Sequence, residues 1–145
     1  MRGIKLLLIS FILGLIVFSC NYYVPKQTYD ISRNNVLVEA GSYVYFEVNL
    51  GYVTDVEIYG NFYAIGGSGD DIKFWIIKTY DIDNFLYDNG DYEIIYSSGQ
   101  QHSSSFDVYD SYIDWDESYY IVLDNSFSII SDKYVNFSVT FEYSE

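Results

Sequence analysis

The sequence predicts an all-β protein, an antiparallel two-sheet β-sandwich, from three observations. Hydrophobic residues make up 50% of the 145 residues and aromatic residues 21%, with 18 tyrosines, and tyrosine and β-branched residues favour the half-buried surface of a sheet. The chain has one proline and no alanine- or leucine-rich helical repeat. From residue 36 onward, apolar and polar residues alternate with a period of two, which is typical of strands with one face in a core.

Three segments show this alternation most clearly. Their apolar positions are Val44, Phe46, Val48 and Leu50 in residues 42–50; Val56, Ile58, Gly60, Phe62 and Ala64 in residues 55–64; and Val135, Phe137, Val139, Phe141 and Tyr143 in residues 133–143. The residues between these positions are mostly polar or tyrosine. We therefore expect each segment to be a strand that contributes one face to the core.

The remaining strands are shorter, and turn signals separate them. Residues 72–77 (IKFWII) are apolar on both faces, which predicts a central strand covered on both sides, or a strand whose Trp75 lies under a loop. Further strands are predicted at 92–96, 105–109 and 119–123, with turns at 88–90, 97–99 and 124–126. This spacing favours a sandwich over the alternative of a closed barrel. Residues 81–90 predict either a short helical turn or a hairpin.

The first twenty residues are typical of an export signal. Arg2 and Lys5 precede an apolar run of 13 residues (6–18), which is shorter than the ~20 residues of a membrane span and predicts a signal peptide over residues 1–19. The segment Val17-Phe18-Ser19-Cys20 resembles the lipobox of bacterial lipoproteins. That resemblance implies that Cys20 is acylated, for example with palmitate, and becomes the new N-terminus. An ordinary cleaved signal and an uncleaved anchor are the alternatives.

The rest of the chain divides into a tether and a domain. Residues 20–35 lack alternation and contain the proline, so they predict a lipidated tether, and residues 36–145 predict the sandwich domain. If the signal segment with Arg2 and Lys5 is removed, the remaining chain has five basic and 21 acidic residues. This charge repels nucleic acid and anionic lipid headgroups and favours cationic partners.

Two stretches, read in order, resemble the GOLD domain. They are VEIYGNFYAIGGSGDDIKFWI (56–76) and YYIVLDNSFSIISDKYVNFSVTFEY (119–143), and with the strand at 42–50 the resemblance covers about residues 40–143. GOLD domains occur in luminal cargo receptors of the early secretory pathway, and related sandwiches occur in prokaryotes. The resemblance implies a jelly-roll-like β-sandwich that binds other molecules. The disulfide, coiled coil and membrane helix of the eukaryotic receptors have no counterpart in this sequence, so transport through coat proteins is not implied.

Catalytic residue sets are not recognisable in the sequence. His102, the one histidine, lies in the polar segment GQQHSSSF, and neither a nucleophile–base pair nor a common zinc site can be built around it. We therefore expect a protein that is not an enzyme and has no cofactor. A hydrolase that uses an acid pair is the remaining catalytic alternative, because 21 acids make chance pairs inevitable.

The segment GGSGDD (66–71) has the composition of either a ligand-binding loop or a turn. A phosphate-binding loop leads from a strand into a helix, whereas the following residues predict a strand, so we expect a hairpin-type turn between two core strands. Asp70 and Asp71 are the calcium candidates. Calcium takes six to eight oxygen ligands, so a site would also need acids that the fold brings in from other loops. We assign no metal site from the sequence.

These observations predict a lipoprotein anchored to a membrane by Cys20, with its domain on the extracytoplasmic side, in the periplasm or at the cell surface. We expect the sandwich to bind a protein or a glycan without catalysis and to bind no nucleic acid. The alternative is a carbohydrate-binding or calcium-dependent accessory sandwich. Four tyrosines on polar strand faces are relevant to glycan binding, although we expect the opposite sheet or a loop to cover them: Tyr43, Tyr45, Tyr59 and Tyr63.

Overall fold

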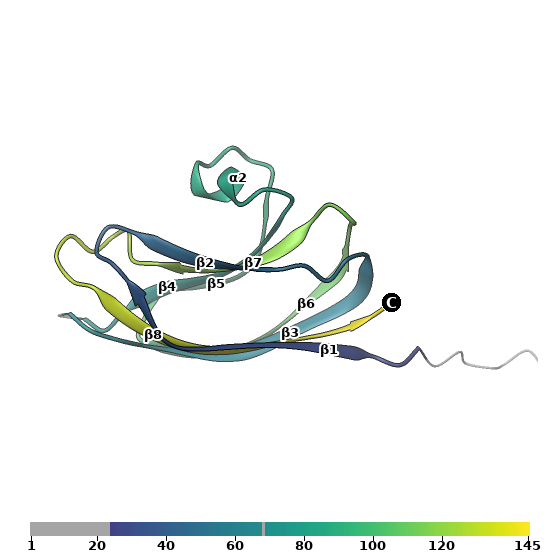
Figure 1. Ribbon diagram of the computed structural model, residues 1–145, viewed down its shortest axis with the longest axis horizontal. Helices are drawn as coiled ribbons and strands as arrows, with labels where there is room; N and C mark the ends of the chain where they lie inside the picture. Colours follow the sequence, from purple (N-terminus) through teal and green to yellow (C-terminus); the bar gives the residue numbers. More distant parts are fainter. Residues whose placement is uncertain (1–23, 68) are drawn as a thin grey trace, which may run out of the picture.

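Two antiparallel four-stranded sheets face each other in the computed structural model, which describes residues 24–67 and 69–145 (Figure 1). Sheet A has the order β1-β8-β3-β6 and sheet B the order β2-β7-β4-β5. The elements are β1 (Gln27–Val38), β2 (Tyr43–Val48), β3 (Val53–Ile65), β4 (Ile72–Thr79), α2 (Ile82–Leu86), β5 (Glu93–Gln101), β6 (Ser103–Ile113), β7 (Ser118–Asp124) and β8 (Lys133–Ser144). The prediction of an all-β, two-sheet antiparallel sandwich is confirmed. The predicted signal peptide and Cys20 lie outside the described residues.

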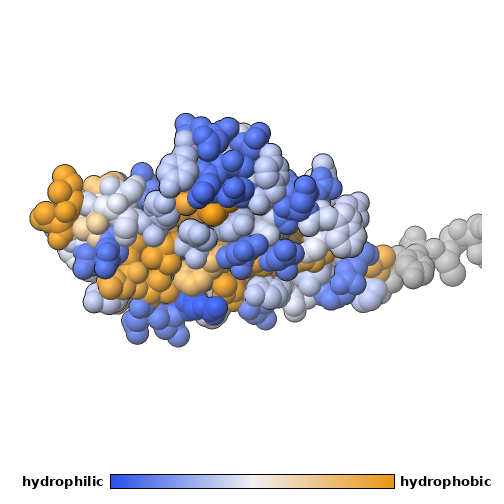
Figure 2. Space-filling view, turned by 45° about the horizontal axis from the view of Figure 1, so that its top comes forward, coloured by the Kyte–Doolittle hydropathy of each residue, from blue (hydrophilic) through white to orange (hydrophobic). Residues whose placement is uncertain are grey.

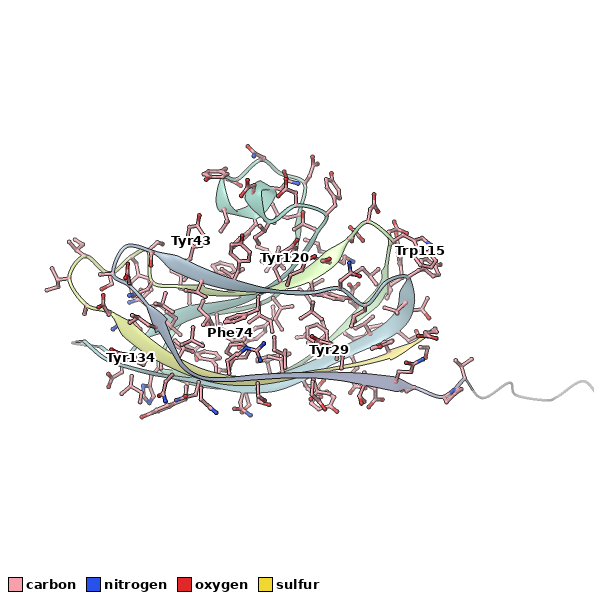
Figure 3. All side chains as sticks on the ribbon, in the orientation of Figure 1. Tyr29, Tyr43, Phe74, Trp115, Tyr120 and Tyr134 are labelled. Carbon is pink, nitrogen blue, oxygen red and sulfur yellow. The ribbon has the colours of Figure 1, made fainter. Side chains whose placement is uncertain are left out.

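The core lies between the two sheets and is built from the alternating faces. The apolar positions predicted on β3 and β8 point inward, and those of β2 pack against the core from the edge of sheet B. Phe74 of β4 lies near the centre (Figure 3), with its ring 4.7 Å from that of Phe62 on the opposite sheet and almost parallel to it. Period-two alternation was therefore sufficient to identify the core faces of these strands.

β4 is covered on both sides, and both interpretations of its sequence hold. It lies between β7 and β5 in sheet B, and its outward-facing Trp75 packs edge-on against Phe85 of α2, with 5.5 Å between ring centroids. Asp81 caps α2 by accepting a hydrogen bond from the backbone N–H of Asp83 at 3.0 Å, as short polar side chains do at helix N-termini. Residues 81–90 thus contain the helical turn rather than the hairpin.

The tether prediction is wrong for residues 27–35, which belong to β1. This strand pairs with β8 from Gln27 opposite Tyr143 to Val38 opposite Lys133, interrupted by a bulge after Arg33. β1 is an edge strand, and Ile31 and Val38 are its buried residues. Because its order depends mainly on backbone hydrogen bonds to β8, its sequence shows no alternation, and the domain begins near residue 27 rather than at residue 36.

Two predicted turns have a different role in the fold. Residues 66–71 connect β3 of sheet A to β4 of sheet B, so they form a crossover between the sheets and not a hairpin. Residues 97–99 lie inside β5, where Gly99 has a φ of 64° and the register against β4 shifts. Positive φ at glycine suits a β-bulge as well as a turn, and composition alone does not distinguish them.

The sandwich has two distinct ends. At the proximal end, on the right in Figure 1, β1 begins and β8 ends; at the distal end lie the β1–β2, β3–β4 and β7–β8 connections. β1 and β8 have 12 residues each, which corresponds to about 40 Å at the usual rise of a strand. Within the described ranges, no helix has the length and apolar character of a membrane span.

Candidate functional site

The β7–β8 loop, residues 125–132, is held at the distal end by the buried side chain of Asn125. Its Nδ2 donates hydrogen bonds to the carbonyl oxygens of Val38 (3.1 Å), Glu39 (3.2 Å) and Ser131 (2.9 Å). One amide thus connects the start of the loop to its end, to the last residue of β1 and to the residue that follows it. Buried amide groups of this kind order a loop because each lost hydrogen bond would leave a polar group unsatisfied.

Hydrogen bonds within the loop shape its tip. The Ser128 hydroxyl donates to the carbonyl oxygen of Ser131 at 2.9 Å, and the Ser131 N–H donates to the Ser128 hydroxyl at 3.2 Å. Ile129 and Ile130 lie between these serines, and each is 91% exposed. The hydrophobic protrusion on the left of Figure 2 lies where Figure 1 shows this loop. The internal bonds therefore support a tip that presents two adjacent isoleucines to solvent.

A cleft of about 480 Å³ lies beside the loop. Its lining consists of Phe127, Ser128, Ile129, Ile130 and Ser131 from the loop, Gly69 and Asp71 from the β3–β4 connection, Gln100 from β5 and Lys133 from β8. The apolar residues of the lining come from the loop, whereas the charged residues come from the adjoining strand and connection. The cleft therefore has an apolar side and a polar side.

The polar groups of the cleft are bonded to one another. The buried Lys133 ammonium donates to the Gly66 carbonyl oxygen at 2.7 Å and lies 3.5 Å from Oδ1 of Asp71. Gln100 Nε2 donates to the other Asp71 carboxylate oxygen. The hydrogen bond from Gln100 lowers the pKa of Asp71, and the Lys133 charge lowers it further, so this carboxylate is ionised at neutral pH. These contacts fix the β3–β4 connection against β8.

Asp70 and Asp71, the calcium candidates, have roles inside the β3–β4 connection. Oδ1 of Asp70 accepts a hydrogen bond from the Gly66 N–H at 2.6 Å, and Asp71 faces Gln100 and Lys133 as described above. Across residues 24–67 and 69–145, no three His, Cys, Asp or Glu side chains are grouped as a metal site requires. The observed contacts of both aspartates stabilise the crossover between the sheets.

Negative charge predominates around the distal loop because its lysines are already paired. Lys73 lies 3.8 Å from an oxygen of Asp124, and its ammonium is 5.4 Å from the ring centroid of Phe127. Lys133 is paired with Asp71. Each of these two positive charges therefore has a carboxylate partner within the sandwich.

Three further acids near the loop, Glu39, Asp70 and Asp132, form no ion pair within the described part of the chain. Asp132 is the last residue of the loop, and its Oδ1 accepts a hydrogen bond from the Ala40 N–H at 2.9 Å. Glu39 adjoins Ala40, and its carbonyl oxygen is one of the acceptors of Asn125. Carboxylates that form no ion pair among the described residues therefore lie in the loop and next to its base.

His102 lies at the junction of β5 and β6. Its ring packs edge-on against Tyr63, with 4.4 Å between centroids, and its carbonyl oxygen accepts a hydrogen bond from the Ala64 N–H at 2.8 Å. The side chain is exposed, as expected from its polar segment. Through these contacts with β3, His102 stabilises the connection between β5 of sheet B and β6 of sheet A.

The expectation that other parts of the fold cover the four tyrosines is wrong. Tyr43, Tyr45, Tyr59 and Tyr63 are between 37% and 45% exposed. The first two lie on the outer face of sheet B and the last two on the outer face of sheet A. Because the sheets face each other through their other sides, these tyrosines are exposed but do not form one aromatic surface.

A second exposed aromatic feature lies at the proximal end. The rings of Tyr52 and Trp115 are stacked, with centroids 5.8 Å apart and planes inclined by 20°. Trp115 is 78% exposed and is labelled at the right of Figure 3. Neither residue was selected from the sequence, because they come from different loops, before β3 and after β6, and their contact depends on the pairing of those strands.

Comparison of the chain with protein-family models and with curated proteins gives no match. The class of protein that the structure defines is an antiparallel two-sheet β-sandwich. Its most exposed hydrophobic residues, among those described, form the distal tip. Ile129 and Ile130 were not selected from the sequence, because the segment SFSIISD (126–132) shows no period-two alternation. Two adjacent isoleucines between serines, outside any alternating pattern, are the signal that could have identified them.

Proposed function

We propose that the protein is a membrane-anchored lipoprotein of the cell envelope whose β-sandwich is a non-enzymatic binding module. The observation that carries this proposal is the position of the two ends. Cys20 lies seven residues before Gln27, where β1 enters the proximal end, whereas the apolar tip lies at the distal end. An anchor at Cys20 would therefore leave the tip directed away from the membrane.

The distal residues support binding better than catalysis. Ile129 and Ile130 form an exposed apolar feature, and such features mark interaction sites when they are bordered by polar residues. The polar groups of the adjoining cleft already bind one another, with Asp71 held between Gln100 and Lys133. The sequence resemblance to GOLD domains also favours a binding role on the extracytoplasmic side.

Labelling of cells with an alkynyl fatty acid tests the anchor. We expect the wild-type chain to take the label and to fractionate with membranes, because acyl chains contribute roughly 0.8 kcal/mol per buried methylene. Cys20→Ser should lose both properties. Ser19→Ala is the matched control, since it keeps a small residue before the cysteine and should retain the label. A Cys20→Ser chain that is still labelled and membrane-bound would contradict the proposal.

Glycan binding is the second candidate function, and the stacked Tyr52–Trp115 pair favours it. Exposed aromatic faces stack on the apolar faces of sugar rings, and Trp115 is the more exposed of the two aromatics. A glycan array probed with the full chain in detergent tests this candidate. Binding that Trp115→Ala abolishes and Tyr59→Ala preserves would support it, and an array without signal would reject it.

A further inference from the structure

We infer that the β7–β8 loop is the contact site of this binding module, and that its partner is a protein surface with an apolar pocket bordered by lysine or arginine side chains. The inference rests on the proposed function and deepens it. Three properties of the distal end carry it: the order of the loop, the charge around its tip and the position of the tip relative to the predicted anchor.

The loop is ordered before any partner binds. Asn125 connects its two ends through three hydrogen bonds, and Ser128 and Ser131 brace the residues on either side of the isoleucines. A preformed loop loses little conformational entropy on binding, so more of the gain from apolar burial appears as affinity. A pair of exposed isoleucines on such a loop fits the central apolar anchor of an interface, surrounded by a polar rim.

The charge near the tip selects a basic partner. Glu39, Asp70 and Asp132 form no ion pair among the described residues, whereas Lys73 and Lys133 are each paired with an aspartate. The whole chain has a formal charge of −14. This field attracts a positively charged partner, and it opposes both an anionic lipid surface and a second copy of the chain.

The position of the tip separates a protein partner from the anchoring membrane. The tip lies at the end of β1 and β8 that is opposite to Gln27, and strands of 12 residues span about 40 Å. If Cys20 holds the chain to a bilayer with the strands upright, the isoleucines lie about 40 Å from the anchored end and do not enter that bilayer. A pocket on another protein is therefore the occupant that the geometry and the charge both favour.

Methyl NMR of the full chain in nanodiscs, with labelled isoleucine δ1-methyl groups, tests the inference. The probes are three short peptides: one alternates leucine and lysine, one alternates leucine and glutamate, and one alternates serine and lysine. We expect the leucine–lysine peptide to shift the Ile129 and Ile130 methyl resonances, which Ile129→Val and Ile130→Val assign. The other two peptides should bind at least about tenfold more weakly, since each lacks one of the two required contacts.

Three variants sharpen this test. Ile129→Ser combined with Ile130→Ser should weaken binding of the leucine–lysine peptide about tenfold or more, while the remaining isoleucine resonances show that the fold is intact. Ile94→Ser is the matched control, because Ile94 is an exposed isoleucine of β5 outside the loop, and it should change the affinity less than about twofold. Glu39→Gln should weaken binding and reduce its dependence on salt.

Other outcomes would overturn the inference. Equal binding of the leucine–glutamate peptide would contradict the basic partner, and shifts caused by vesicles of phosphatidylcholine and phosphatidylglycerol, but not by peptide, would indicate a lipid surface. Shifts that grow with protein concentration alone would indicate a second copy, and unmoved tip methyls would exclude the loop as a site. A failure of the proposed anchor can be distinguished from a failure of this inference. Fractionation of the Cys20→Ser variant reports on the anchor independently of the peptide-binding results.

Discussion

The Lys78 ammonium nitrogen lies 2.8 Å from Oδ2 of Asp110, and this ion pair joins β4 of sheet B to β6 of sheet A. Both side chains are buried, with exposures of 8% and 5%. The Tyr119 hydroxyl donates to the same carboxylate oxygen at 2.8 Å, and Glu93 reaches Lys78 from the surface, also at 2.8 Å. The cluster thus satisfies two buried charges between the sheets near the proximal end.

Replacing Asp110 should destabilise the sandwich strongly. In Asp110→Ala, Lys78 keeps the exposed Glu93 carboxylate and the Tyr112 carbonyl oxygen as partners but loses its buried counter-charge. Tyr119 loses its acceptor, so we expect the free energy of unfolding to fall by about 3 kcal/mol. Lys78→Met combined with Asp110→Leu should cost less, because no charge is left unpaired in the core. Denaturant titration measures both. Glu93→Gln is the control, and a loss there as large as in Asp110→Ala would contradict the assignment.

The same cluster predicts a loss of stability at alkaline pH. Burial lowers the pKa of Lys78, but hydrogen bonds and charge from Asp110 and Glu93 outweigh burial and raise it. Burial and Asp110 raise the pKa of Tyr119. A group with a raised folded-state pKa contributes stability that is complete below its unfolded pKa, about 10 for both groups, and is lost as the pH rises further.

We therefore expect melting temperatures to be insensitive to these groups at neutral pH and to fall above about pH 10. Thermal melts over a pH series measure this effect. The double variant of Lys78→Met and Asp110→Leu should show a shallower alkaline decline, since it lacks the Lys78 contribution and the carboxylate that faces Tyr119. An equally steep decline in that variant would assign the effect to other residues.

Gly60 should tolerate no side chain. It lies in β3 between Val139 of β8 and Phe106 of β6, and a Cβ added there would overlap the carbonyl oxygen of Ser138. Glycine inside a strand often marks such a close backbone approach, so Gly60→Ala should reduce the free energy of unfolding by about 3 kcal/mol. Asn61→Ala, on the exposed face, is the control, and equal stability of the two variants would contradict the predicted overlap.

Asn125→Ala should loosen the distal loop. The change removes an amide whose two N–H hydrogens are shared among three carbonyl oxygens. We expect a loss of about 2 kcal/mol, and the end of the loop is freed from β1. Hydrogen exchange of residues 126–131 should become faster, and the leucine–lysine peptide should bind more weakly although both isoleucines are present. Asn136→Ala, which removes a single hydrogen bond to the Asn35 N–H, should leave the loop unchanged.

The local pattern of apolar and polar residues was sufficient to predict the strands that line the core. The alternation in residues 55–64 and 133–143 identified the inward faces of β3 and β8, and the uniformly apolar β4 was identified as a strand with both sides covered. β1 escaped prediction because few of its side chains are buried and backbone pairing with β8 orders it. Turn residues at 66–71 and 97–99 indicated bends in the chain but not which strands pair.

The candidate site was less predictable than the fold. The sequence predicted an export signal, showed the excess of acids and identified the core faces of the strands, because each of these depends on neighbouring residues and on the two-residue period of a strand. The exposure of Ile129 and Ile130 depends on Asn125 reaching the carbonyl oxygen of Val38, 87 residues away. Such contacts exist only after the sheets have paired, since burial and long-range hydrogen bonds are properties of the folded chain.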